Sequence, residues 1–254
     1  MILHPALNDI IHLKTVDSTN LELKRRRHEF QGKNILLLSD EQTAGQGQKG
    51  RKWESVSGLG LWMSLYLGSP HMLLHDLQLL SVYTGRIVHH TIAPLLDREM
   101  SLKWPNDIMC SGKKCGGILS EVQWQGNAAI SAIVGVGINL NHQQHDFSPT
   151  IQETATSLQL EGLQEPDRTM LAQTFVNEFF QGLGQLDDGK KLATSWNQVA
   201  YMLNQTVVWE TSDKAMTGQF SGINEWGEAL IKIEGEIRVF HTGEIRLKSP
   251  LSSV

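Results

Sequence analysis

The sequence has 254 residues, of which 40% are hydrophobic and 19% charged, a balance typical of a globular chain rather than a disordered one. Its formal net charge of −5 argues against a nucleic-acid coat or a binder of anionic membranes, and its two cysteines are too few for a disulfide scaffold or a four-cysteine zinc site. Because there is no signal-peptide pattern and no apolar run near ~20 residues, we expect a cytoplasmic protein that binds neither nucleic acid nor membrane.

The first part of the chain shows helices and strands with recognisable limits. Asp17-Ser18 is a helix-start signal, and Gly32 is suited to close that helix at its C-terminal end. Residues 34–39 predict a buried strand, and apolar residues at every second position of 59–67 predict a half-buried one. Apolar residues at helical spacing then predict that residues 71–96 are mostly helix.

The middle of the chain predicts a set of paired strands and one further helix. A Ser111-Gly112 turn favours a hairpin between the strands on either side of it. A nearly continuous apolar run at 128–136 is typical of a strand covered on both faces. Asp167 is placed to cap a helix whose apolar side chains recur at helical spacing. The other predicted strands are Ser101–Trp104, Asp107–Cys110 and Lys114–Val122.

The sequence changes character after about residue 204, where short strands alternate with glycines. That spacing suggests a small all-β barrel of about 50 residues. At about 150 residues per domain, the length allows one large domain and one small one. We therefore predict an α+β chain with a mixed body at residues 1–204 and a β barrel at residues 205–254. The predicted strands of the barrel are Thr206–Glu210, Met216–Ile223, Glu228–Glu234, Ile237–Phe240 and Glu244–Lys248.

A glycine-rich segment between Gly45 and Trp53 contains the pattern G-x-G-x-x-G together with three cationic side chains. A dinucleotide-binding fold needs that pattern to open a helix, whereas here it leads into a β-strand. A P-loop needs Lys followed by Ser or Thr, where this chain has Arg51 and Lys52. Backbone amides and cations suit an anion cradle, and a mobile surface loop explains the same residues. On these residues alone both interpretations stay open.

Three other segments carry side chains suited to chemistry. Lys103 ends a predicted strand between bulky apolar residues, where it is either a site residue or an edge lysine whose stem lies over the next tryptophan. Gly116-Gly117 interrupts a strand, which indicates a close approach by a ligand or another backbone. Asn139 and Asn141 follow an apolar strand and either read a nucleobase edge or form an Asx turn.

Taken in this order, the segments resemble the biotin–protein ligase family over nearly the whole chain. The motifs that carry the resemblance are Asp17-Ser18-Thr19-Asn20, Gln42-Thr43-Ala44-Gly45, Lys103-Trp104-Pro105-Asn106-Asp107, Gly116–Glu121, Gly135–Asn141, Ala155-Thr156-Ser157-Leu158, Gly222-Ile223-Asn224 and Gly243-Glu244-Ile245. The resemblance implies a mixed-sheet catalytic domain like those of class II aminoacyl-tRNA synthetases and biotin–lipoate ligases, followed by a small SH3-like barrel. The implied chemistry uses ATP and Mg²⁺ to convert biotin into biotinoyl-5′-AMP. The acyl group then passes to one lysine of a biotin carboxyl carrier protein.

The resemblance also implies roles for individual residues. Lys103 is the implied catalytic residue, acting at both the biotin carboxylate and the α-phosphate. No residue is assigned as a metal ligand, because magnesium commonly binds substrate phosphates and few carboxylates. The implied biotin-binding residues are Ser18, Thr19, Asn20, Gln42, Gly45, Gln46, Lys103, Gly116, Gly117 and Ile118. The implied ATP- and adenylate-binding residues are Gln48, Lys49, Arg51, Trp53, Asn106 and Asn139, and Trp53 suits a core role equally well.

The glycine-rich segment departs from the family pattern at two positions. Relatives commonly have arginines where this chain has Gln46 and Gln48. Glutamine donates hydrogen bonds but carries no charge, so it cannot form the charge-assisted phosphate contact of an arginine. We therefore expect weaker retention of the adenylate, which Lys49 and Arg51 would offset in part.

Three alternative functions are weighed against biotin ligation. A lipoate–protein ligase shares the fold and the chemistry, but the polar Ser18, Thr19 and Gln42 favour an ureido ring over an apolar dithiolane. A biotin-sensing repressor would add an N-terminal helix-turn-helix, for which the sixteen residues before Asp17 are too few, so a monofunctional ligase is expected. The third alternative is a catalytically silent biotin-binding module. The resemblance also allows a homodimer.

The remaining histidines and cysteines suggest no further site. His89-His90 and the pair His142 and His145 lack a third ligand at convincing spacing, so we expect surface histidines rather than a metal site. Cys110 and Cys115 flank a predicted hairpin and are expected to be reduced packing residues.

Overall fold

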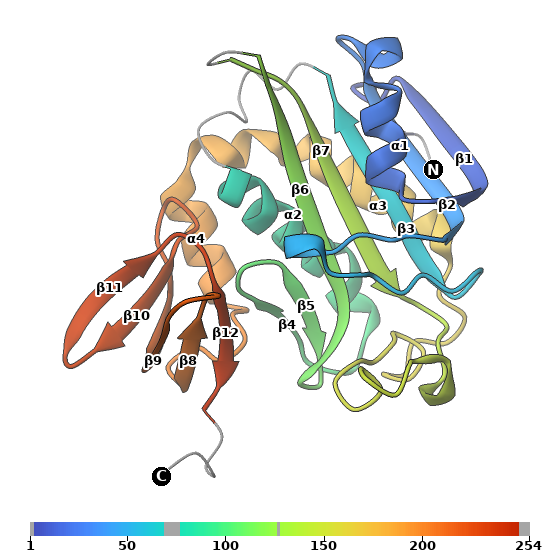
Figure 1. The fold of residues 1–254 in the computed structure, drawn as a ribbon. Helices are drawn as coiled ribbons and strands as arrows, with labels where there is room; N and C mark the ends of the chain where they lie inside the picture. The colour runs from blue at the N-terminus through green and yellow to red at the C-terminus, as the bar shows by residue number, and fades with distance from the viewer. Residues whose placement is uncertain (1–2, 69–76, 126–127, 249–254) are drawn as a thin grey trace.

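A computed structural model describes residues 3–68, 77–125 and 128–248, and its centre is a seven-stranded mixed sheet (Figure 1). Its strands are β1 (Asp9–Val16), β2 (Asn34–Gln42), β3 (Gly60–Leu67), β4 (Met100–Lys103), β5 (Asp107–Cys110), β6 (Lys113–Gln125) and β7 (Ala128–Asn139). They lie in the order β1-β2-β3-β7-β6-β5-β4. Only the β1–β2 pair in this described sheet is parallel, and the other neighbouring pairs are antiparallel.

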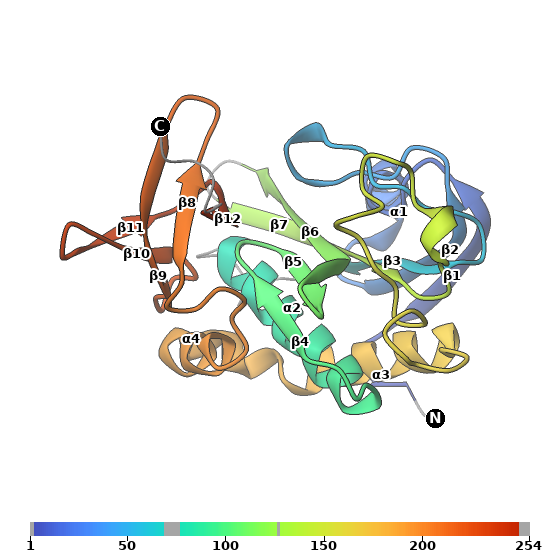
Figure 2. The same ribbon diagram turned by 90° about the horizontal axis from the view of Figure 1, so that it is seen from below.

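Helices cover both faces of this sheet (Figure 2). The helices are α1 (Thr19–Arg25), α2 (Leu77–Ile92), α3 (Arg168–Gln181) and α4 (Gly189–Asn197). Short 3₁₀ turns lie at Arg27–Phe30, Gln48–Gly50, Ala93–Leu95, Gln144–Asp146 and Leu183–Asp187. One face carries α1, which packs against β2, β3 and β7, while α2 and α3 cover the opposite face. No helix in the described part of the chain has the length and apolarity that crossing a membrane requires.

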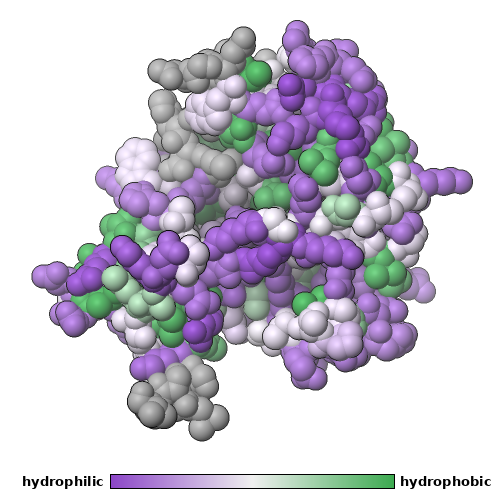
Figure 3. Space-filling model, viewed as in Figure 1, coloured by the Kyte–Doolittle hydropathy of each residue, from purple (hydrophilic) through white to green (hydrophobic). Residues whose placement is uncertain are grey.

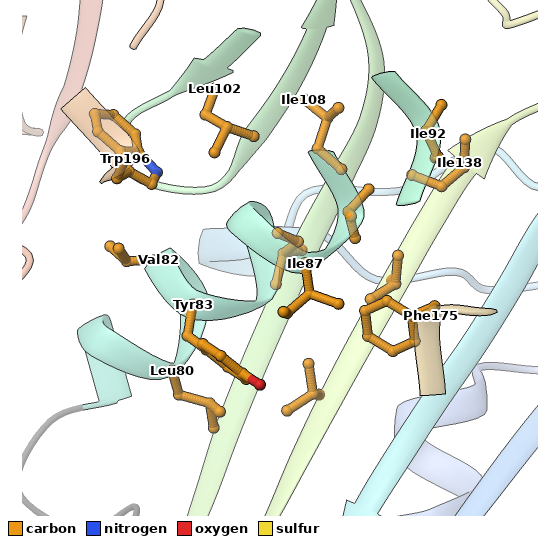
Figure 4. Close-up of a cluster of buried hydrophobic side chains, with 14 of the residues drawn as sticks. Leu80, Val82, Tyr83, Ile87, Ile92, Leu102, Ile108, Ile138, Phe175 and Trp196 are labelled. Atoms are coloured by element: carbon orange, nitrogen blue, oxygen red, sulfur yellow. The ribbon is translucent and has the colours of Figure 1, made fainter. Parts of the chain in front are cut away.

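The main hydrophobic core lies between the sheet and the helices α2 and α3. Figure 4 shows Leu80, Tyr83 and Ile87 of α2 in one buried cluster with Phe175 of α3 and Leu102 of β4. Burying side chains of this size contributes about 1.5–3 kcal/mol each. A smaller apolar cluster lies under α1 on the other face, so both faces of the central strands are covered.

The strand β3 is more buried than its sequence pattern suggests. Alternation at 59–67 predicted a half-buried strand, which is wrong because every residue of β3 is buried. Leu61 and Leu65 belong to the main core. The alternate side chains Trp62 and Ser64 are covered by the glycine-rich segment and by α1. A polar residue on that second face therefore marks a contact with a neighbouring element rather than with water.

The predicted helices are confirmed with changed limits. The first begins at Thr19, but it ends at Arg25, and Gly32, with φ of +69°, follows a 3₁₀ turn instead of closing the helix. The helix predicted at 71–96 is observed as α2 and the following 3₁₀ turn at 93–95, while 71–76 lie outside the described residues. Asp167 caps α3, because its carboxylate accepts hydrogen bonds from two amides of the first turn. The sequence interpretation missed β1 and α4.

A second sheet of five antiparallel strands follows. Its strands are β8 (Thr206–Glu210), β9 (Ala215–Ile223), β10 (Ala229–Ile233), β11 (Glu236–Phe240) and β12 (Glu244–Leu247), in the order β11-β10-β9-β8-β12. The five predicted strands and a small C-terminal β domain are thereby confirmed, while closure into an SH3-like barrel stays a prediction.

The two sheets share one apolar core. Val207, Phe220 and Ile231 of the second sheet belong to the same buried cluster as the residues of α2. The Trp104 indole N–H donates a hydrogen bond to the Gly227 carbonyl at 3.0 Å, which joins the end of β4 to this sheet. The boundary at residues 204 and 205 therefore stays a proposal based on the change in element type.

Candidate active site

A cavity of about 630 Å³ opens on the α1 face of the main sheet and brings together most of the predicted site residues. The predicted residues that line it are Ser18, Thr19, Asn20, Gln42, Gln46, Gln48, Arg51, Trp53, Lys103, Asn106, Gly117, Ile118 and Asn139. Gly45, Lys49 and Gly116 lie outside its lining. The hydrophilic band across the middle of Figure 3 lies where the segment 45–53 crosses in front of β6 and β7 in Figure 1.

Polar side chains at the start of α1 form a connected hydrogen-bond network. The Thr19 amide and hydroxyl both donate to Gln42 Oε1, at 2.8 and 3.0 Å. The Ser64 hydroxyl lies 2.7 Å from Thr19 Oγ1 and 2.6 Å from Asn20 Oδ1. Ser18 precedes the helix without a side-chain capping bond, although it is almost fully buried. The network holds amide and hydroxyl groups in fixed positions at this end of the cavity.

Asn20 serves mainly to join α1 to the sheet. Its side-chain amide donates to the Leu119 carbonyl at 3.2 Å and to Glu121 Oε2 at 3.0 Å. A Cβ atom at Gly135 would lie 2.4 Å from Asn20 Oδ1, so only glycine on β7 allows this approach. The polar atoms of Asn20 are thus occupied within the protein, which indicates a positioning role at the cavity wall.

Trp53 lies over glycines of two neighbouring strands. Gly117 of β6 and Gly137 of β7 are paired in register, and a Cβ at either would come within 3.2 Å of the indole. Gly45 does not line the cavity, and a Cβ there would be 2.6 Å from the Trp53 carbonyl oxygen. Gly116 faces the opposite side of β6, toward Ile138 and the core. A close approach does occur at Gly117, but it is made by the Trp53 ring and not by the ligand or backbone that was predicted.

Three charged side chains meet where β4, β5 and β6 run side by side. Asp107 lies opposite Lys103 in the β4–β5 register. Its carboxylate lies 3.7 Å from Lys103 Nζ and 2.5 Å from Lys114 Nζ. The Lys103 side chain is 23% exposed and that of Asp107 is 19% exposed. Two lysines with one carboxylate leave an excess of positive charge on this wall, which suits an anionic ligand.

The glycine-rich segment carries its cations at the cavity mouth. The segment folds back on itself, because the Trp53 amide donates to the Gly45 carbonyl at 2.8 Å. Lys49, with φ of +58°, directs Nζ to within 3.2 Å of Glu244 Oε1 on β12, and Arg51 also pairs with that carboxylate. Their side chains are 50% and 60% exposed. The C-terminal sheet therefore contacts the segment that was predicted to bind ATP.

The far end of the cavity lies beyond the end of β7. Asn139 is buried, and its amide donates to the Thr156 carbonyl at 3.0 Å. His142 was predicted to be a surface histidine, which is wrong: it is 2% exposed and lines the cavity. Burial lowers the pKa of His142 below its usual value. Its ring stacks on Phe147 with centroids 5.0 Å apart.

The other histidines differ in exposure, and both cysteines are buried. His90 and His145 have largely exposed side chains, as predicted, whereas His89 is partly buried with Nε2 3.0 Å from the Met100 carbonyl oxygen. Cys110 and Cys115 are free and buried, which confirms the packing interpretation, and burial raises the pKa of Cys110 to about 11. Within the described ranges, no group of three or more His, Cys, Asp or Glu side chains could hold a metal ion.

Several wall residues were missed from the sequence. Lys114 adjoins the Gly116-Gly117 motif, and Asp107 ends the motif that contains Lys103, so both were within reach of a motif-based search. Glu244 stands in the Gly243-Glu244-Ile245 motif that contributed to the resemblance, but no site role was assigned to it. His142 and Phe147 reach the cavity only through tertiary packing, and the sequence gives no local signal for them.

Comparisons with known proteins identify the family. The biotin/lipoate A/B protein ligase family model matches residues 13–139, half of the chain. The bifunctional ligase/repressor BirA of Bacillus spizizenii is 30% identical over 94% of this chain and 74% of its own length. The biotin–[acetyl-CoA-carboxylase] ligase of Mycobacterium tuberculosis is 27% identical over 83% and 78%.

A solved structure gives the same result at the level of the fold. The biotin protein ligase of Aquifex aeolicus in complex with biotin and ATP superposes with a TM-score of 0.82 and 29% identity, covering 95% of this chain and 99% of that one. The mixed-sheet fold implied by the sequence resemblance is thereby confirmed. The chain belongs to the biotin/lipoate A/B protein ligase family.

Proposed function

We propose that the protein is an ATP-dependent biotin–protein ligase, which forms biotinoyl-5′-AMP and transfers the biotinoyl group to one lysine of a biotin carboxyl carrier protein. The observation that carries the proposal is a single cavity with fixed polar groups at one end, two lysines on its wall and cations at its mouth. The relatives from Mycobacterium tuberculosis and Aquifex aeolicus are biotin ligases, which supports biotin over lipoate as the acid.

The network at the start of α1 is suited to an ureido ring. Such a ring presents two N–H donors and one carbonyl acceptor, and it is recognised by several hydrogen-bonding groups at once. Ser18, Thr19 and Gln42 offer hydroxyl, amide and carbonyl groups there. An apolar dithiolane offers these polar groups no hydrogen-bond partner, and a site built to pair with a polar ring rejects such an analogue by up to ~10⁴–10⁵. We therefore assign biotin recognition to this end.

In the activation step, a carboxylate oxygen of biotin attacks the α-phosphorus of ATP, the new P–O bond forms, and pyrophosphate leaves. Two anions must meet, and negative charge spreads over the phosphate oxygens in the transition state. Lys103 is a wall cation whose Asp107 partner is 3.7 Å away, so its ammonium has donors left for a substrate. We assign Lys103 to the bridging position between carboxylate and phosphate.

Gln48, Lys49 and Arg51 are proposed to contact the phosphates, and Asn106 and Asn139 to complete the nucleotide site. Mg²⁺ would accompany the ATP phosphates and neutralise part of their charge when bound. The cavity lining includes carboxylates at Asp107 and Asp146, oxygen ligands of the kind that this ion prefers. We assign no single protein ligand to the ion.

In the transfer step, the amine of the acceptor lysine attacks the carbonyl carbon of the mixed anhydride, AMP leaves, and the amine gives up a proton. The acceptor must enter at the cavity mouth, beside the segment 45–53. We propose a carrier domain as partner and the cytoplasm as location, in keeping with the two free thiols. Homodimerisation stays a prediction, which sedimentation velocity of the purified protein tests.

The proposed function is tested with purified protein, MgATP, a biotin carboxyl carrier domain, and biotin or lipoate. We expect mass spectrometry to find one added biotinoyl group on one lysine, and pyrophosphate exchange to respond to biotin. If lipoate alone stimulates exchange, the acid substrate is lipoate and the assignment of biotin is wrong. Biotin binding without exchange would indicate a silent binding module.

A further inference from the structure

The cavity has two ends, which Trp53 separates. Successive residues on one face of a strand lie about 7 Å apart, and Gly135, Gly137 and Asn139 share one face of β7. Asn20 of α1 lies against the first of these and Trp53 against the second. The third marks the far end, away from the network assigned to biotin.

A series of aromatic rings continues from Trp53 to the far end. Trp53 meets Trp62 edge to face with centroids 6.4 Å apart, and Trp62 meets His142 in the same way at 5.9 Å. His142 and Phe147 are nearly parallel, with an interplanar angle of 9°. Of these rings, Trp53, His142 and Phe147 line the cavity, so its far end carries aromatic side chains in contrast to the hydroxyl and amide groups of the α1 end.

Unpartnered nitrogen atoms gather in the same series. In the described part of the chain, four buried side-chain atoms have no hydrogen-bond partner, and three of them are Trp53 Nε1, Trp62 Nε1 and His142 Nδ1. Native proteins pair almost all such groups, so each exception needs an explanation. Of the three, the His142 atom belongs to a side chain that is both almost fully buried and part of the cavity lining.

The surroundings keep the His142 imidazole mainly neutral. Burial is the largest effect on its pKa and lowers it, against the weaker opposing influence of Asp146, Glu54 and the Leu59 backbone. A neutral imidazole offers one donor and one acceptor, and it can pair with either kind of group on a ligand. Such a ring can hydrogen-bond to the polar edge of a ligand without placing a full charge beside it.

Resting on the proposed function, we propose that His142 is a specificity-determining residue for the nucleotide, with Nδ1 hydrogen-bonded to the polar edge of adenine. A purine is the part of the two substrates that combines flat apolar faces with a polar edge. The aromatic wall supplies contacts for the faces. The unpaired nitrogen of His142 supplies the partner for the edge.

The test compares His142→Phe, which keeps a ring against Phe147, with His145→Phe, a matched histidine that is 82% exposed three residues away. KM is measured by biotin-dependent pyrophosphate exchange for ATP, 7-deaza-ATP, 1-deaza-ATP and purine riboside triphosphate. Each analogue lacks one polar group of the adenine edge. Calorimetric Kd values for the same nucleotides, measured without biotin so that no adenylate forms, give a readout that does not need turnover.

We expect His142→Phe to weaken ATP binding about tenfold, which corresponds to the loss of one buried hydrogen bond. The one analogue that lacks the group paired with Nδ1 should bind wild type and His142→Phe equally well. His142→Asn, which keeps a polar atom near the position of Nδ1, should restore part of the discrimination. Equal weakening of ATP and all three analogues by His142→Phe, or no weakening of ATP, would overturn the proposal. Failure of exchange with biotin would count against the proposed function, while the calorimetric comparison still decides the role of His142.

Discussion

The wall formed by β4, β5 and β6 and the glycine-rich segment 45–53 both present cations to one cavity, but they hold them differently. Lys103 is 23% exposed on a strand whose following turn is fixed by hydrogen bonds between Asn106 and Ile118, at 2.7 and 3.0 Å. Lys49 and Arg51 are at least half exposed and share one carboxylate from another sheet. The wall is preorganised, whereas the segment depends on weak contacts that a ligand can replace.

This difference suggests a division of labour. A group held by a sheet can stabilise charge in a transition state without reorganisation, so its loss should appear in the rate of adenylation. Groups on an exposed segment contribute mainly to ligand affinity and retention, because they must be ordered when the ligand binds. Four substitutions test the division, two on the sheet and two at the segment.

Removal of the wall cation should have the largest effect. We expect Lys103→Ala to lower kcat for biotin-dependent pyrophosphate exchange by roughly 10²–10³-fold, the usual cost of removing one fixed electrostatic group. Lys14→Ala, an exposed strand lysine on β1, is the control and should leave the rate unchanged. Adenylation that survives in Lys103→Ala with only a raised KM would place this lysine with the segment cations instead.

A methyl group on β7 tests the rigidity of the sheet beneath Trp53. In Gly137→Ala the new Cβ would lie 2.9 Å from Trp53 Nε1, so the indole must move. Overpacking of this kind costs about 1–3 kcal/mol, so we expect roughly a tenfold or larger loss in kcat/KM for biotin. Gly184→Ala is the control, because its Cβ would meet no atom within 4 Å. Unchanged kinetics in Gly137→Ala would mean that the contact between Trp53 and the sheet is not rigid.

The same contrast explains what the sequence could predict. Lys103 stood out because a lysine between apolar residues at a strand end is unusual, and the order of local motifs indicated the family. His142 was misread because its neighbours in sequence are polar, while its burial comes from Trp62 and Phe147. Glu244 was not assigned to the site for a related reason, since it lies about two hundred residues from Lys49 in sequence and meets it through tertiary packing.

Burial on both faces was the other feature that periodicity could not give. The apolar alternation in β3 predicts one covered face and one face, with Ser64, that is exposed to solvent. In the structure α1 covers that second face. The strand β1 lies at the sheet edge with mostly exposed side chains, so it lacks the apolar pattern that marks a strand. Most strands of this chain can be predicted from their local sequence. Which of their faces are buried depends on the elements that pack on the sheet.

At the segment, adding a charge should slow the escape of the adenylate. Gln48 lines the cavity at a position where the family resemblance implies an arginine, and a charge-assisted phosphate contact is stronger than a neutral one by about 1 kcal/mol. We expect Gln48→Arg to slow release of biotinoyl-5′-AMP by about fivefold in a stopped-flow or filter assay, with the rate of its formation little changed. Gln31→Arg, an exposed position distant in sequence, is the control. Equal or slower release from wild type would contradict the expected weakness of this site.

Removal of the shared carboxylate should have the smallest effect and should fall on ATP affinity alone. Glu244 holds Lys49 Nζ at 3.2 Å and also pairs with Arg51, so in Glu244→Gln the ordering of both side chains must accompany ATP binding. Exposed pairs of this kind are worth below about 1 kcal/mol each, so we expect KM for ATP to rise about two- to fivefold with kcat unchanged. The difference should shrink as salt is added, because these charges are screened. Glu236→Gln, an exposed glutamate of the same sheet, should change neither constant. A fall in kcat in Glu244→Gln would show that the segment cations act in the chemical step, and the division between wall and segment would then be wrong.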